Sequence, residues 1–365
     1  MTAQAQDIPS TALGMDASKR RINGLDSIRF VCAFIVVLRH VNLIPGGLHG
    51  GGSAGIAKFL IGIFNSLFNG PAAVIIFFLI SGFCIHFPFR SGRTPELGAF
   101  YCRRFFRIVP PAIVFFLCWK FLLHEPGGIN DTVLWSVCCE VIYYFLYPAL
   151  LFFRQRSSWM LLIGLSTLVT AVLLWTQRGS LSYDNYNYVA LGNLTWVVGL
   201  PCWLLGCWLA ENYLRVKAPS TWTLWGMRLS VYGLSVVLAM IHVHAELLSN
   251  RLSFLRSDCI LLNLFAIPAC YWLAHEMAYG SVHGDNRYLE WAGTWSYSLY
   301  LVHLLVPRIA AVVGFQDRPQ NHVLILLAIL IASYLFYLAI ERPSHRLAVN
   351  LGRRIVPGKV SAAAL

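Results

Sequence analysis

The sequence predicts an all-α protein that crosses a lipid bilayer about ten times. Hydrophobic residues make up 58% of its 365 residues and charged residues only 12%, and the mean hydropathy is +0.63. Apolar runs of about 20 residues, the length that a helix needs to cross the hydrocarbon core, recur along the chain to residue 341. Because a backbone in lipid must satisfy its own hydrogen bonds, we expect these runs to be helices.

The apolar runs and the basic residues between them predict the topology. We expect spans at 27–44, 72–89, 106–123, 133–153, 158–175, 191–210, 222–243, 255–277, 289–312 and 322–341. Lysine and arginine concentrate before the first span, in alternate loops and after the last span, so the positive-inside rule predicts that both termini are cytoplasmic. The predicted units are a cytoplasmic tail at 1–23, a membrane domain at 24–343 and a cytoplasmic tail at 344–365. Pro343 is expected to stop the last helix and to leave Glu341 at the cytoplasmic surface.

Composition also excludes several classes of protein. The formal net charge of +12 does not indicate nucleic-acid binding, because the basic residues alternate between loops instead of forming one patch. Most of the ten cysteines fall inside apolar spans and none forms a C-x-x-C pair, which favours packing over disulfides or metal ligation. We expect no metal cofactor and no cleavable signal peptide.

The stretch GLDSIRFVCAFIVVLRH at 24–40, which contains most of the first span, carries Arg29 near one end and His40 at the other. Eleven residues make about three helical turns, so both side chains share one face about 16 Å apart along the axis. Asp26 lies one turn before Arg29 and can pair with it. A charge and an imidazole inside a membrane segment normally face a protein interior or a wet cavity. This helix is therefore predicted to be the wall of a reaction chamber.

The loop after the second span ends in YCRRFFRIVPP at 101–111, the densest basic cluster of the chain. Arg104 and Arg107 are three residues apart, hence neighbours on a helix, and Arg103 lies beside them. Clustered guanidinium groups suit multidentate binding of phosphate. Arginines next to a span also fix topology and hold anionic lipids, and composition alone does not separate these interpretations.

Two more predicted spans contain polar side chains. Glu140 lies about two turns inside LWSVCCEVIYYFLYP at 134–148, with Tyr144 on the same helical face. A lone intramembrane carboxylate indicates a functional group, the alternative being a structural partner for an arginine. In WSYSLYLVH at 295–303, Tyr300 and His303 either line the cavity or bond across helices, and the second interpretation is favoured.

Taken together, these stretches resemble the acyltransferase-3 family, integral membrane enzymes that commonly O-acylate bacterial surface sugars. The resemblance runs in order along nearly the whole chain, through GLDSIRFVCAFIVVLRH, FFLISGF at 77–83, RRFFRIVPP, WSVCCEVIYYFLYP, WSYSLYLVH and ERP at 341–343. The sequence departs from the family at Val141, where a second acid is common, and at Cys138 and Cys139, where small or aliphatic residues are usual. Many relatives add a soluble esterase-like domain after the last span; here we expect the stand-alone form.

The resemblance implies transfer of an acyl group, usually acetyl, from cytoplasmic acyl-CoA to a sugar hydroxyl on the outer side of the bacterial inner membrane. The acceptor would be a polysaccharide, an exopolysaccharide or a lipid-linked saccharide. His40 is then expected to be the general base. Arg29 would stabilise the oxyanion or grip the donor, and Glu140 would orient His40 or pair with an arginine.

The remaining expectations concern binding. Arg103, Arg104 and Arg107 would hold the donor phosphates, and Tyr144, Tyr300 and His303 are candidates for lining the substrate site. Implied partners are the lipid bilayer, the saccharide acceptor and proteins of polysaccharide assembly. Two rival functions are a transporter or flippase for a lipid-linked saccharide and a scaffold within an assembly complex, because buried polar groups also suit a translocation path. The sequence does not define the sugar, the hydroxyl or the oligomeric state.

Overall fold

The computed structural model describes residues 22, 24–41, 62–64, 66–124, 128–177, 188–243, 258–315 and 321–355, in which it contains helices and no strands. Most of the predicted N-terminal tail, and the end of the predicted C-terminal tail, lie outside these residues. The helices are α1 (Leu25–His40), α3 (Gly70–His86), α4 (Leu97–Leu117), α5 (Leu134–Arg154), α6 (Trp159–Thr176), α7 (Thr195–Asn212), α8 (Thr221–Val243), α9 (Asp258–His283), α10 (Arg287–Gly293), α11 (Ser296–Val302), α12 (Leu305–Val312), α13 (His322–Phe336) and α14 (Arg342–Ile355). Shorter 3₁₀ or π segments are Phe87–Phe89, Cys118–Leu122, Ile129–Asp131, Tyr188–Leu194, Tyr213–Arg215 and Tyr337–Glu341.

The predicted all-α membrane fold is confirmed. Every predicted span overlaps helix, and seven helices in the described part of the chain are long and apolar enough to cross a membrane. Three predicted spans fall outside that set: α1 has only 16 residues, α4 carries three arginines, and 289–312 is divided among α10, α11 and α12. These irregular spans are the ones that carry His40, the basic cluster and His303.

Helix α3 lies at the centre of the bundle because it is apolar on all sides and therefore needs neighbours all round. Its main neighbour is α7. Gly82 of α3 lies directly against the carbonyl of Trp203, and Gly206 of α7 lies directly against the carbonyl of Leu79. Any Cβ at either glycine would meet backbone, so two glycines bring the axes of α3 and α7 close together.

The helices define two opposite faces of the bundle. Gly70, at the start of α3, packs against Arg39 near the end of α1, whereas Cys84, near the end of α3, contacts Arg29 near the start of α1. Helices α1 and α3 are thus antiparallel, and α4 begins at the face where α1 begins. We call this side the arginine face and the opposite side, where α1 ends at His40, the histidine face.

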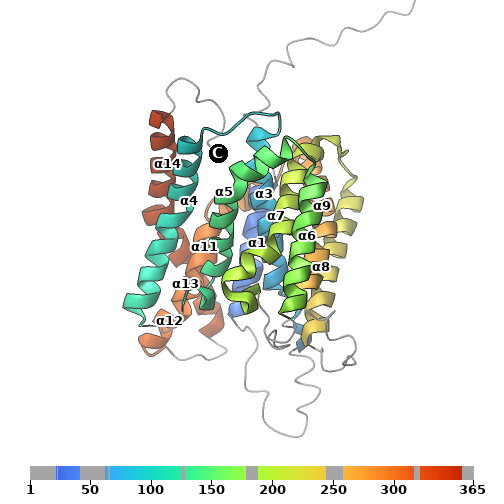
Figure 1. Ribbon diagram of the computed structural model, residues 1–365. Helices are drawn as coiled ribbons and strands as arrows, with labels where there is room; N and C mark the ends of the chain where they lie inside the picture. The colour runs from blue at the N-terminus through green and yellow to red at the C-terminus, as the bar shows by residue number, and fades with distance from the viewer. Residues whose placement is uncertain are drawn as a thin grey trace, which may run out of the picture.

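At one edge of the bundle, α4 and α14 lie side by side, as Figure 1 shows. The close approach is explained by three small residues at four-residue spacing on α14, Ser344, Ala348 and Gly352. Ser344 donates a hydrogen bond to the carbonyl oxygen of Phe106, and Gly352 packs against the side chain of Arg103. Helix α14 therefore ends at the arginine face, the same face at which α1 begins.

Three sequence-based expectations were wrong in detail. Pro343 does not stop the last helix: the chain continues from α13 through a π segment, Tyr337–Glu341, into α14. A proline is tolerated in the first turn of a helix, where its missing N–H has no partner to lose, and the preceding π turn changes the hydrogen-bond register. The basic cluster predicted for a loop lies inside α4, which begins at Leu97. The span at 289–312 is broken near Trp295 and again at His303.

Candidate active site

Helix α1 holds Arg29 firmly and leaves His40 at its last residue. Arg29 donates hydrogen bonds to Asp26 Oδ1 at 2.9 Å and to Cys84 Sγ of α3 at 3.2 Å, so the expected Asp26 pair is present. His40 is exposed, and its Nδ1 lies 2.8 Å from the carbonyl oxygen of Val36. Because a carbonyl only accepts, Nδ1 of the neutral ring carries the proton and Nε2 keeps a lone pair.

His303 lies beside His40, at the break between α11 and α12. The two ring centroids are 5.0 Å apart and the planes are tilted by 52°. His303 is fully buried; its Nδ1 lies 2.7 Å from the carbonyl oxygen of Tyr300, and its Nε2 has no hydrogen-bond partner among the described residues. Tyr300 itself bonds Ser136 of α5 at 2.7 Å. Tyr300 therefore ties α11 to α5, whereas His303 offers a free acceptor next to His40.

Glu140 lies deeper in the bundle, among arginines. Its carboxylate is within electrostatic range of Arg29 and Arg107, and the hydroxyl of Tyr144 approaches Oε2 at 3.5 Å. The same hydroxyl lies 3.1 Å from Oγ of Ser81 on α3. Of the two roles expected for Glu140, this arrangement favours a partner for arginine over a partner that orients the general base.

Two arginines of α4 reach the same polar interior. The guanidinium of Arg104 lies 5.8 Å from the ring centroid of Tyr144, and His345 of α14 is within electrostatic range of both Arg104 and Arg107. Neither arginine forms an ion pair with a described residue. Arg103 packs instead on α14 and is not part of this group. Arg107 is also within electrostatic range of Glu140 and Glu341. Guanidinium groups that no ion pair occupies can bind an anionic ligand.

Glu341 joins this interior, although the sequence places it at the surface. Its Oε2 accepts hydrogen bonds from the backbone N–H of Ser298, at 3.1 Å, and from the Ser298 hydroxyl. The carboxylate is within electrostatic range of Arg107 and Arg29. It therefore stabilises the first turn of α11, the helix that ends next to His303. The sequence feature that could have indicated a buried Glu341 is that this carboxylate directly follows a long apolar run.

These side chains form a polar column that runs from the arginine face to the histidine face. We use this name for Arg104, Arg107, Arg29, Glu140, Glu341, His303 and His40. The column begins with Arg104 and Arg107, which form no ion pair with a described residue, continues past Arg29 and the two carboxylates, and ends at two imidazoles. Such an arrangement can bind an anionic group at one end and accept a proton at the other.

Comparison with known proteins agrees with this chemistry. The model of the acyltransferase-3 family, described as an acyltransferase domain, matches residues 22–342. The chain belongs to this family. It is also similar to acyltransferase MdmB of Streptomyces mycarofaciens, with 25% identity over 343 residues covering 78% of this chain and 82% of that protein. No solved structure matches it. The family match spans every residue of the polar column.

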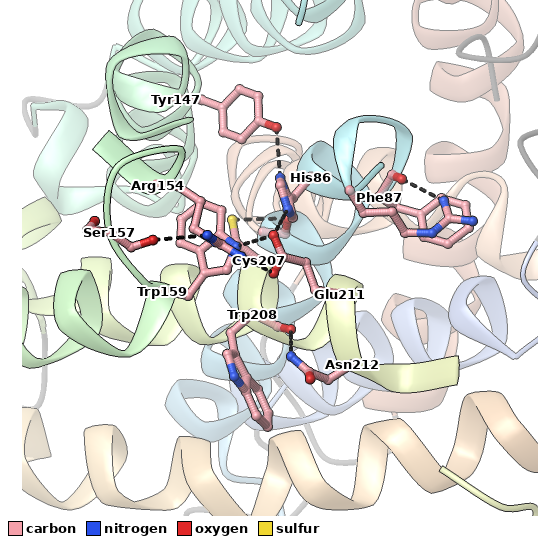
Figure 2. A network of polar contacts seen from close by, with 12 residues as sticks. His86, Phe87, Tyr147, Arg154, Ser157, Trp159, Cys207, Trp208, Glu211 and Asn212 are labelled. Carbon is pink, nitrogen blue, oxygen red and sulfur yellow. Dashed lines mark hydrogen bonds and ion pairs between the residues drawn. The ribbon is translucent and has the colours of Figure 1, made fainter. Parts of the chain in front are cut away.

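A second buried polar group in this membrane acyltransferase lies near the arginine face and was not anticipated from the sequence. Figure 2 shows this Glu211 cluster, in which α3, α5, α6 and α7 converge. Glu211 accepts from Arg154 at 2.8 Å and from Trp159 Nε1 at 2.8 Å, and lies 3.0 Å from His86 Nε2. The other nitrogen of His86 lies 2.9 Å from the hydroxyl of Tyr147. Each polar residue of the cluster lies near the end of a different apolar run, and this position is the feature of the sequence that could have indicated the cluster.

Proposed function

We propose that this acyltransferase moves an acyl group, with acetyl as the first candidate, from cytoplasmic acyl-CoA to a sugar hydroxyl on the outer side of the membrane. The observation that carries the proposal is the polar column, with unpaired guanidinium groups at one end and a pair of imidazoles at the other. Arg29 and His40 are about 16 Å apart along α1. A donor with phosphates at one end and a thioester on a long flexible arm fits this separation.

The donor end would be organised by Arg104 and Arg107. Guanidinium groups bind phosphate oxygens through paired, charge-assisted hydrogen bonds, and neither of these two forms an ion pair with a described residue. Arg29, already bonded to Asp26, is better suited to direct the arm of the donor than to reach the reacting carbon near His40.

The chemistry would take place at the histidine face. His40 Nε2 accepts the proton of the acceptor hydroxyl while the hydroxyl oxygen attacks the thioester carbonyl carbon. The tetrahedral intermediate then expels the thiolate, and the imidazolium returns the proton to the sulfur. His40 suits this role because its ring is exposed, so its charged form remains partly solvated, and because its proton is held on Nδ1 by Val36.

The test compares O-acetyl content of surface polysaccharide, by proton NMR, in a strain that lacks the gene and is given back either wild type or His40→Ala. Membrane expression of both forms is checked on the same cells. Return of acetyl signals with wild type alone supports the proposal and identifies the acylated sugar from its shifted resonances. If the amount or export of the polymer changes while its acyl pattern does not, the protein is a transporter or a scaffold instead of an acyltransferase for this polymer.

A further inference from the structure

The two imidazoles at the histidine face present the same hydrogen-bonding pattern. In each ring Nδ1 lies within 2.8 Å of a backbone carbonyl oxygen, that of Val36 for His40 and that of Tyr300 for His303. Both neutral rings therefore carry their proton on Nδ1 and keep an acceptor lone pair on Nε2. The ring centroids are 5.0 Å apart, which is close enough for two neighbouring hydroxyls of one sugar to serve the two rings, since a hydrogen bond from O–H to nitrogen spans about 3 Å.

The two rings differ in burial, and the difference separates their roles. His40 is exposed, whereas His303 is 0% exposed. A positive charge on a fully buried ring with no carboxylate partner is costly, so His303 is a poor base. A buried acceptor without a partner is also costly and rare in native proteins. Nε2 of His303 has no hydrogen-bond partner among the described residues, which indicates that a ligand supplies the missing donor.

We propose that His303 is a second acceptor-binding residue, whose Nε2 receives a hydrogen bond from the hydroxyl adjacent to the one that His40 deprotonates. The acceptor is then a sugar with two neighbouring free hydroxyls, of which one is acylated and the other is read by His303. This inference rests on the proposed function, because it assigns the acceptor of the same site.

The experiment measures acetyl transfer from radiolabelled acetyl-CoA to methyl glucoside, methyl galactoside and methyl mannoside, using the full chain in detergent micelles. Each sugar that is acetylated is compared with the analogue that lacks the hydroxyl next to the acetylated position. The variants are His303→Ala and His303→Gln, whose amide oxygen can replace part of the acceptor function. The control is His275→Gln on α9, which removes an imidazole whose Nδ1 also bonds a carbonyl of its own helix, that of Tyr271 at 2.9 Å.

Wild type and His275→Gln should prefer the intact sugar over the deoxy analogue by about tenfold or more in kcat/KM, because the deoxy analogue leaves a buried acceptor unpaired. His303→Ala should lose this preference, and His303→Gln should keep part of it. If wild type accepts both sugars equally, or if His303→Ala keeps the preference in a folded protein, the inference is overturned while acyl transfer to sugars stands. If wild type acetylates no saccharide, the proposed acceptor class and this inference fail together.

Discussion

The polar column and the Glu211 cluster are two polar regions that both include a residue of α5 but differ in how their charged groups are paired. Glu211 is shared by an arginine, a histidine and a tryptophan, and within that cluster Arg154 Nε is the buried side-chain atom left without a partner. In the column, Nε2 of His303 is unpartnered, and Arg104 and Arg107 have no ion-pair partner among the described residues.

This contrast separates a region that serves structure from one that serves a ligand. In the Glu211 cluster the carboxylate is bonded by three side chains from α3, α5 and α6, so the network joins the ends of four helices. Unpaired polar groups in a buried setting lower stability, so their presence indicates that another molecule supplies the partners. Variants in the column should therefore impair activity more than stability, and variants in the cluster should do the reverse.

The largest expected effect is on turnover, at the exposed end of the column. His40→Ala removes the proposed general base, which contributes about 10²–10⁴ in rate. Its side-chain bond is to its own helix, so the free energy of unfolding should change little. Acetyl transfer and unfolding in micelles are measured on the same preparation. Turnover within twofold of wild type would contradict the assignment.

The next effect is on stability, in the Glu211 cluster. Glu211→Ala strands the guanidinium of Arg154 and a nitrogen of His86, and we expect a loss of about 3 kcal/mol in the free energy of unfolding. Arg156→Ala is the control, because that guanidinium stacks 3.6 Å from the ring centroid of the neighbouring Phe152 at the surface. Unfolding in micelles followed by tryptophan fluorescence gives both values. Equal stability of the two variants would show that the cluster is not a structural joint.

A smaller effect is expected at the contact between α3 and α7, which connects the two regions. Gly206→Ala places a methyl group against the carbonyl of Leu79 and should cost about 1–3 kcal/mol. Gly226→Ala on α8 is the matched control, since a Cβ there meets no atom within 4 Å and alanine favours helix by about 1 kcal/mol. Opposite shifts in unfolding midpoint are predicted, and shifts of the same sign would refute the close-packing account.

The smallest effect distinguishes neighbouring arginines of α4. Arg104→Gln should raise the KM for acetyl-CoA about tenfold, the value of one charge-assisted hydrogen bond, without a comparable fall in kcat. Arg103→Gln should change KM by less than about threefold, because Arg103 packs on Gly352 of α14 instead of facing the column. Initial rates against acetyl-CoA concentration measure both. A larger effect at Arg103 would move the donor site to the surface between α4 and α14.

The helical fold was predictable because apolar runs of bilayer length indicate membrane-spanning helices. The helices α5, α6, α7 and α13 lie close to the ranges predicted for them. Arg29 and Glu140 were also predictable as interior groups, since charges within apolar runs are conspicuous, whereas His40 is exposed at the last residue of α1. The break at His303 was missed, although the sequence carries a signal for it: Pro307 stands four residues later, where it cannot donate a hydrogen bond to the carbonyl of His303.

Two other features depend on tertiary packing. Helix α14 carries Pro343 in its first turn, and the packing of its small residues on α4 was not evident from the sequence. The Glu211 cluster combines side chains from the ends of separate runs, and pairwise sequence spacing cannot reveal that they meet. In both cases the residues were visible in the sequence but their partners were not.

The proposed function requires the donor to bind from one side of the membrane and the acceptor from the other. The direct test uses the purified protein in sealed liposomes. Protease cleavage of a C-terminal tag shows which way the protein is oriented. Radiolabelled acetyl-CoA is added at the arginine face and a membrane-impermeant saccharide acceptor at the histidine face, or the reverse. Acetylated saccharide is expected only in the first arrangement. Product that requires donor and acceptor on the same side would contradict it.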